Sequence, residues 1–215
     1  MKSECRIAVT PGFLLMLSVL FYLDEGVDLL GWSLLACSVH ELGHIAIIYL
    51  FGGKIERLKL TAVGAELELN SKRPLSYVQE CLAALAGPMA NLFLAGVAMG
   101  GRLFLLAGLS LGQGVFNLLP LLPLDGGRCL YFALGRIVNI NWAEAVLCVT
   151  SAVTTGILLG IGFVFGHIFG NITLLITALW LFAGLLKRNV LNWKPGFWGK
   201  GKKPLQFRQD YGNIP

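Results

Sequence analysis

The stretch "SVHELGHIAIIYLFGG", residues 38–53, places two histidines and a glutamate in an otherwise apolar segment. Ionisable side chains are costly in hydrocarbon and usually persist there because they serve a function. His40 and His44 are four residues apart, so a helix places both imidazoles on one face, where they can bind one metal ion. Glu41 lies about 100° further around the helix, where it can take a proton from a water without being a ligand. The pattern predicts a metal site with a general base; a polar cluster that mediates helix packing is the plainer alternative.

The composition around this stretch is that of a membrane protein. Of the 215 residues, 56% are hydrophobic and 13% are charged, whereas about a quarter of the residues in a soluble domain are charged. The apolar residues fall in runs of about twenty, which is the length of a helix that crosses a bilayer. We therefore predict an all-α polytopic membrane protein whose environment is the lipid bilayer.

The apolar runs predict about six transmembrane helices. A signal peptide is the alternative for the first run, but no small-x-small cleavage pattern precedes the sequence "DEG", so we expect a retained helix. Residues 1–186 are predicted to form the membrane-embedded domain, and residues 187–215 a basic cytosolic tail. The helices are expected at residues 8–23, 29–51, 75–100, 103–122, 143–165 and 169–186.

The positions of lysine and arginine predict that both termini are cytosolic. With the N-terminus in the cytosol, every basic residue except Arg102 falls in a cytosolic segment. The first external loop instead carries Asp24, Glu25 and Asp28. The basic tail anchors this topology and can bind anionic lipid. The net charge of +5 therefore requires no nucleic-acid partner.

Residues 54–70, "KIERLKLTAVGAELELN", alternate apolar and polar side chains with a period of two. This pattern predicts a β-hairpin between the second and third helices, on or dipping into the cytosolic face of the membrane. A surface hairpin without a special role fits the pattern equally well. The five cysteines have no paired spacing, so small buried hydrophobic residues are expected rather than a disulfide framework.

A catalytic zinc site needs a third protein ligand and an open position for water. His167 falls in a predicted external loop and is poorly placed, and Cys37 fits a small buried residue better than a competing thiolate. Asp125 lies in "NLLPLLPLDGGR", where prolines and glycines prevent a regular helix. Unwound backbone is tolerated at membrane depth when protein or a water-filled cavity surrounds it. Such a break could bring Asp125 to the two histidines; a simple turn at the membrane surface is the alternative.

Three patches of the chain together resemble the site-2 protease family of intramembrane zinc metalloproteases. The patches are "HELGH" at residues 40–44, "AGPMAN" at 86–91 and "NLLPLLPLDGG" at 117–127. Their order on successive helices matches as well, and the layout is similar to the sporulation branch that processes a pro-sigma factor. The resemblance therefore implies a multi-pass protein of the bacterial cell membrane.

The resemblance also implies roles for individual residues. One zinc ion would be held by His40, His44 and Asp125, with Glu41 as the catalytic base and acid. Residues of the other two patches would bind or place the substrate, and these are Asn91 and Asn117. The hairpin at residues 54–70 would pair with an extended substrate by strand addition.

The expected function is hydrolysis of peptide bonds in transmembrane or membrane-tethered protein substrates, within or near the bilayer. Two alternatives stay open. A divalent-metal transporter would use the histidines as a transit site, and it predicts ligands spaced along a pathway and no essential Glu41. A catalytically silent relative would only bind membrane-protein partners.

Overall fold

The fold is built of seven helices and three strands within the residues that the computed structural model describes, which are 6–23, 28–61, 64–69 and 75–190. The strands are β1 (Arg6–Val9), β2 (Ile55–Thr61) and β3 (Gly64–Leu69). The helices are α1 (Pro11–Leu23), α2 (Leu29–Leu50), α3 (Tyr77–Gly100), α4 (Phe104–Asn117), α5 (Asp125–Ile137), α6 (Ile140–Phe169) and α7 (Thr173–Val190).

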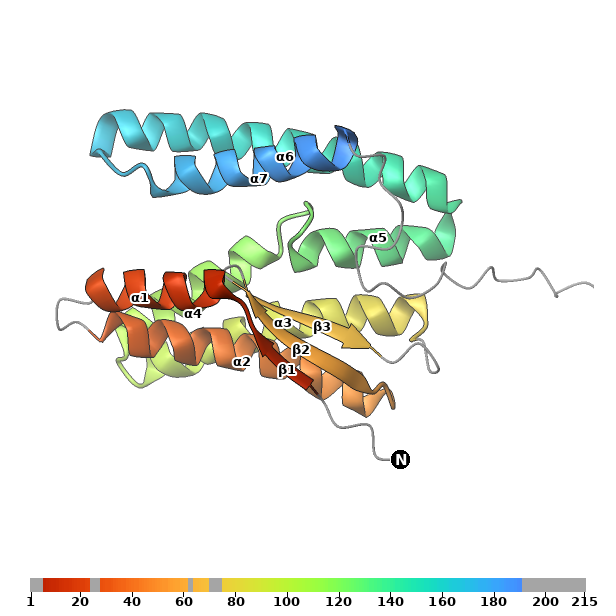
Figure 1. The fold of residues 1–215 in the computed structure, drawn as a ribbon, viewed down its shortest axis with the longest axis horizontal. Coiled ribbons are helices and arrows are strands. Elements are labelled where there is room, and N and C mark those ends of the chain that lie inside the picture. The colour runs from red at the N-terminus through yellow and green to blue at the C-terminus, as the bar shows by residue number, and fades with distance from the viewer. Residues whose placement is uncertain (1–5, 24–27, 62–63, 70–74, 191–215) are drawn as a thin grey trace, which may run out of the picture.

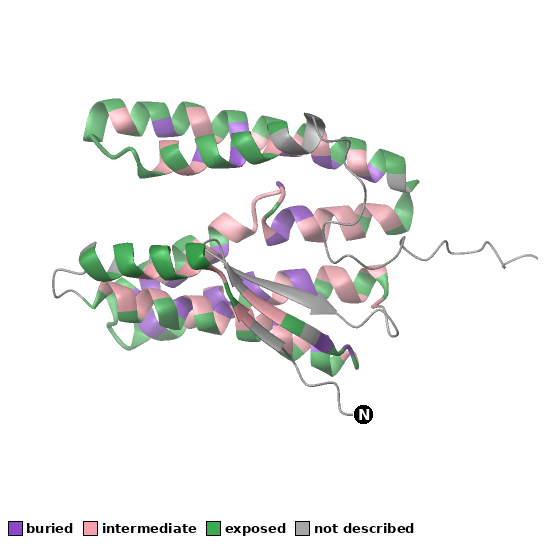
Figure 2. Cartoon of the chain, viewed as in Figure 1, coloured by how far each residue is buried: buried purple, intermediate pink, exposed green. Residues whose placement is uncertain are grey.

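Helix α3 is the centre of the fold, because it packs against α2, α4 and α5. Helices α6 and α7 pack on each other and join the other helices chiefly through α5 (Figure 1). Buried residues gather where α2, α3, α4 and the start of α5 face one another, whereas much of α1, α6 and α7 is exposed (Figure 2). The structure therefore has a small helical core, with an additional helix pair beside α5.

The contact between α2 and α3 is close because a glycine stands at the crossing. A Cβ atom on Gly43 would lie 2.6 Å from the carbonyl oxygen of Ala86 and 3.0 Å from the Cβ of Ala90. Small residues allow helix backbones to approach closely, as is common in membrane proteins. The buried residues of α2 recur every fourth position and include His40 and His44, so this face of α2 is turned toward the core.

The predicted hairpin is confirmed and forms part of a larger sheet. Strands β2 and β3 are antiparallel, and β1 pairs with β2 in parallel, with Arg6 opposite Arg57 and Val9 opposite Leu60. The first helix was predicted to begin at residue 8, which is wrong because that segment is strand β1. Helix α1 begins at Pro11, a residue preferred at the first helical position. Apolar residues continue from β1 into α1, so the sequence pattern does not show where the strand ends and the helix begins.

The fourth predicted helix is also shorter than expected, because α4 ends at Asn117. Residues 118–124 form a loop that contains Pro120, Pro123 and a cis peptide bond between Leu122 and Pro123. Helix α5 follows and is an additional helix that the predicted set did not contain. Proline has no N–H to donate to the preceding turn, which explains the interruption.

The apolar helices indicate a membrane protein. Among the described residues, three helices are long and apolar enough to cross a bilayer, and the helices at Phe104–Asn117 and Thr173–Leu186 are apolar but shorter. The outward side chains fit this setting, since Phe93, Trp142 and Phe163 are 76%, 68% and 68% exposed. The count of six transmembrane helices is not confirmed and stays a prediction. Most of the predicted basic tail lies outside the described residues.

Two cysteines differ from expectation. The sulfur atoms of Cys81 in α3 and Cys129 in α5 lie side by side, and the two Cα atoms are 4.3 Å apart. The expectation of small buried residues did not include this proximity. The pair is separated by 48 residues, and it comes together through the packing of α3 on α5, which the spacing of cysteines does not reveal.

The crossing of α2 and α3 can be tested with Gly43→Ala. The added methyl group would collide with the backbone of α3, so we expect the free energy of unfolding to fall by about 1–3 kcal/mol, as is usual for overpacking. The measurement is denaturant unfolding of the detergent-solubilised protein. Gly31→Ala on the same helix is the matched control, because nothing lies within 4 Å of that position. Equal stability of the two variants would contradict the close crossing.

Candidate metal centre

His40 and His44 lie one turn apart on the buried face of α2, and each residue is only 4% exposed. Their rings meet edge to face with centroids 4.8 Å apart. The two Nε2 atoms lie 3.1 Å from each other. The sequence spacing thus places both imidazoles together, with one nitrogen of each directed at the same point.

Asp125 reaches the same point from the start of α5. Its Oδ2 atom lies 3.0 Å from His40 Nε2 and 3.2 Å from His44 Nε2. The loop before Asp125 folds tightly against the helix start, since a Cβ on Gly127 would lie 2.5 Å from the carbonyl oxygen of Leu121. A hydrogen bond from the Leu122 N–H to Ser151 Oγ, 3.3 Å long, holds this loop against α6. The interrupted segment therefore delivers the carboxylate to the two imidazoles.

The three atoms fit one zinc ion. Their separations of 3.0, 3.1 and 3.2 Å are close to the roughly 3.3 Å expected between ligands on a tetrahedral zinc with bonds near 2 Å. Two imidazoles and one carboxylate form a donor set of the catalytic zinc type, with a fourth position left for water. Among the described residues, these three form the group that is able to hold a metal ion.

The residue of α3 that faces the two imidazole nitrogens is Gly87. A Cβ atom on Gly87 of α3 would collide with His44 Nε2 and would lie 2.9 Å from His40 Nε2. Any side chain at this position would therefore occupy the space toward which the metal-facing nitrogens point. Gly87 belongs to the "AGPMAN" patch, and this contact gives a physical reason for glycine there.

Each of the three ligands also has a partner behind it. His44 Nδ1 donates a hydrogen bond to the carbonyl oxygen of Ala83 at 2.7 Å, which leaves Nε2 free for a metal. The carboxamide of Asn91 lies 3.3 Å from His40 Nδ1. The Oδ1 atom of Asp125 lies 3.5 Å from Arg128 Nη1. Such partners orient metal ligands and are part of a working site.

Asp125 presents a carboxylate oxygen to the two imidazoles. The ionised carboxylate is the form that binds a cation.

Glu41 lies on the neighbouring face of α2 and is half-buried. Cys37, one turn earlier, lies near Gln113 of α4 and near Glu41. This face of α2 is thus turned toward α4 and is not part of the ligand group. The contact with Gln113 agrees with the expectation that Cys37 does not compete for the metal.

The remaining predicted residues do not belong to the ligand group. Asn91 is completely buried and contacts His40; its role in substrate binding stays a prediction. Asn117, at the end of α4, donates a hydrogen bond to the carbonyl oxygen of Gln113 in its own helix at 3.1 Å. His167 is exposed in the last turn of α6, so its predicted place in a loop is wrong, but it is still away from the metal ligands.

Sequence reasoning missed Arg128 and Ala83, which contact ligands, and Ser151, which contacts the loop before Asp125. Arg128 follows Asp125 by three residues, a spacing that brings side chains together on a helix, but its use depends on a helix that was not predicted. The carbonyl of Ala83 and the hydroxyl of Ser151 carry no sequence signal, because any residue supplies a carbonyl and many helices contain serine.

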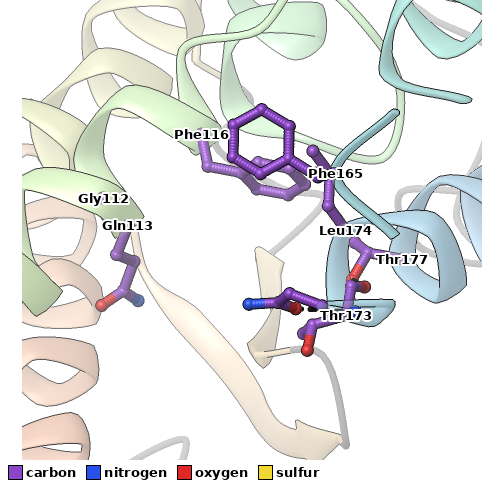
Figure 3. A pocket seen from close by; sticks show the side chains of 8 residues that line it. Gly112, Gln113, Phe116, Phe165, Thr173, Leu174 and Thr177 are labelled. Carbon is purple, nitrogen blue, oxygen red and sulfur yellow. Dashed lines mark hydrogen bonds between the residues drawn. The ribbon is translucent and has the colours of Figure 1, made fainter. Parts of the chain in front are cut away.

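A pocket of about 530 Å³ lies between α4 and the α6–α7 pair (Figure 3). Gln113 and Phe116 of α4 line one side of it, and Phe165 of α6 and Thr173 of α7 line the other. None of the three metal ligands lines this pocket. Gln113 nevertheless connects the two regions, since it also contacts Cys37 on the Glu41 face of α2.

The requirement for glycine at position 87 gives a direct test. In Gly87→Ala, the methyl group would occupy the space between the imidazole nitrogens, so we expect zinc affinity to fall by at least about tenfold. Competition with a chromophoric chelator measures this affinity. Gly96→Ala, on the same helix with nothing within 4 Å, should bind zinc like the wild type. Unchanged affinity in Gly87→Ala would show that the nitrogens do not point at a shared ion.

No protein-family model matches the chain, but individual known proteins are similar to it. The chain is 31% identical to Stage IV sporulation protein FB of Bacillus subtilis, over 68% of this chain and 54% of that protein. It is 30% identical to a zinc metalloprotease of Methanocaldococcus jannaschii, over 58% of this chain and 41% of that protein. The chain thus spans about half or less of the length of these curated relatives.

A solved structure is similar across nearly the whole fold. The site-2 protease from Methanocaldococcus jannaschii matches with a TM-score of 0.63 and 25% identity, over 84% of this chain and 89% of that one. The match includes most of the described helices, and the resemblance predicted from the three sequence patches is confirmed. The chain is therefore similar to site-2 proteases both in sequence and in fold.

Proposed function

We propose that this protein is an intramembrane zinc metalloprotease that hydrolyses peptide bonds of membrane-tethered protein substrates within or near the bilayer. The observation that supports it most strongly is the buried meeting of His40, His44 and Asp125, with Glu41 beside the first histidine. A purely structural cluster would not need three ligand atoms within 3.2 Å of one another. The names of the relatives point to the same chemistry.

The chemistry divides between the ion and the protein. A zinc ion in the site would polarise the peptide carbonyl and make a water acidic enough to attack it near neutral pH. The Glu41 carboxylate takes the proton of the attacking water and then passes it to the leaving amine. His44 is kept in the required tautomer by its hydrogen bond to the Ala83 carbonyl, so its Nε2 remains available as a ligand.

The sheet suggests how the substrate is held. A transmembrane helix hides its peptide bonds, so the substrate must be extended before water can attack. In the strand order β1-β2-β3, β3 is an edge strand among the described residues. An extended peptide can add to such an edge through main-chain hydrogen bonds, which position it without demanding one sequence.

The membrane setting supports a membrane-tethered substrate. Three helices are long and apolar enough to cross a bilayer, so a substrate reaches the buried site from within or beside the membrane. The distribution of basic residues supports cytosolic termini in a bacterial cell membrane. The likeness to a sporulation protein makes a membrane-tethered pro-protein the first substrate to test.

A divalent-metal transporter fits less well. A transit pathway needs ligands spaced along it, whereas the metal-binding group found among the described residues is one compact cluster. A catalytically silent relative would have no use for Glu41 next to that cluster. Proteolysis accounts for both features.

The role of Glu41 predicts the behaviour of Glu41→Gln. Cleavage of a co-expressed membrane-tethered substrate should fall by about 100-fold or more, as expected when a general base is lost. Zinc content should not change, because Glu41 is not a ligand. Substrate and product are quantified by immunoblot, and Glu144→Gln in α6 serves as the control that keeps activity. Undiminished cleavage by Glu41→Gln would refute the mechanism.

The ligand set makes a separate prediction about zinc content. Purified His40→Ala and Asp125→Ala should each lose most of the zinc that the wild type carries. Catalytic zinc sites have three protein ligands, and each of these variants would keep only two. Mass spectrometry of the metal measures the zinc-to-protein ratio. His167→Ala is the control and should retain full zinc. Full occupancy in Asp125→Ala would remove the aspartate from the ligand set.

A further inference from the structure

Asp125 turns its two carboxylate oxygens toward different partners. Its Oδ2 atom faces the imidazoles, at 3.0 Å from His40 and 3.2 Å from His44. Its Oδ1 atom faces Arg128, whose Nη1 lies 3.5 Å away. The side chains of Asp125 and Arg128 are 10% and 20% exposed, so this contact is largely removed from solvent.

A second carboxylate lies near the same guanidinium. Glu80, in the first turn of α3, is within electrostatic range of Arg128. Arg128 therefore interacts with the charge of an acid on its own helix and with that of an acid on the neighbouring helix. The planar guanidinium of arginine has five N–H donors in fixed directions, so it can interact with two carboxylates at once. The ammonium group of lysine does not fix the directions of its donors in this way.

The charge of Arg128 is unexpected beside a site for a dication. A neighbouring positive charge repels the ion, and burial strengthens this repulsion. On charge alone, the site would bind metal better with a neutral residue at position 128. The contact with Oδ1 indicates a geometric reason for the arginine, because it acts on the oxygen that does not face the imidazoles.

We propose that Arg128 is a positioning residue that keeps Asp125 a one-oxygen ligand. This role rests on the metal centre proposed above. A carboxylate can bind a metal through one oxygen or two, and a second oxygen would fill the position that a catalytic site leaves open for water. Arg128 would hold Oδ1 away from a bound ion, and the negative charge of Glu80 would favour this position of the guanidinium.

The spectrum of the cobalt(II)-loaded protein tests this role without measuring proteolysis. Four-coordinate cobalt absorbs visible light more strongly than five- or six-coordinate cobalt, and coordination geometry is diagnostic of the ligand set. Arg128→Gln should lower the visible absorptivity per bound cobalt by about twofold or more, while cobalt affinity stays within about threefold of the wild type or rises. Arg128→Lys should give an intermediate spectrum, because it keeps the charge without the planar fork.

Arg136→Gln is the matched control. Arg136 is exposed in the last turn of the same helix, so its loss removes a charge from α5 without touching the site. Its spectrum and cobalt affinity should equal those of the wild type. Glu80→Gln should shift the spectrum in the same direction as Arg128→Gln, but by less.

Two results would overturn the role of Arg128. One is a wild-type spectrum in Arg128→Gln. The other is a loss of cobalt affinity of more than about tenfold with an unchanged spectrum, which would make the arginine a support for binding and not for ligand geometry. If Arg128→Gln does not fold, wild-type spectra in both Arg128→Lys and Glu80→Gln are sufficient to reject it.

The experiment also separates this role from the proposed function. Failure of the wild type to give any cobalt spectrum would overturn the metal centre itself, and the protease function with it. A normal wild-type spectrum that no variant alters rejects only the role of Arg128 and leaves the metal centre in place.

Discussion

The structure depends on the close crossing of α2 and α3. Two imidazoles cannot face hydrocarbon, so the protein must enclose them, and α3 does this with a surface of small residues. Gly43 lets the two backbones approach, and Gly87 leaves space for the imidazole nitrogens. Ala83 and Asn91 on α3 contact the outer nitrogens of the two rings. One helix therefore shields the site, shapes it and orients its ligands.

The second requirement is a carboxylate that does not come from either of these helices. The loop of residues 118–124 supplies it by ending α4 early and beginning α5 at Asp125. The loop is short and packs closely against Gly127 at the start of α5, and the Leu122 N–H donates a hydrogen bond to Ser151 of α6. Helices α4, α5 and α6 thus share in placing one side chain, although only α5 carries it.

The sequence contained much of the site and less of the architecture around it. The spacing of His40 and His44 predicted their shared face, because helical periodicity is local. The prolines before Asp125 predicted a break, but not the helix that follows. The same limit applies to β1, whose partner lies about fifty residues away in the chain, and to Arg128, whose contact exists only once α5 has formed. Features set by neighbours in sequence could be predicted. Of the features set by neighbours in space, the approach of Asp125 to the histidines was expected because a zinc site needs a third ligand, whereas the pairing of β1 and the contact of Arg128 were not.

The distance along the chain between the ligands has a thermodynamic consequence. His40 and Asp125 are separated by 85 residues and meet only when α2, α3 and α5 are packed. An unfolded chain does not present these donors together, so a zinc ion held by them would bind the folded state preferentially, and its binding free energy would add to the stability of the fold. Each tenfold increase in free zinc above its dissociation constant would add about 1.4 kcal/mol. The proposed metal centre would then also act as a cross-link between distant parts of the chain, and stability would vary with zinc supply.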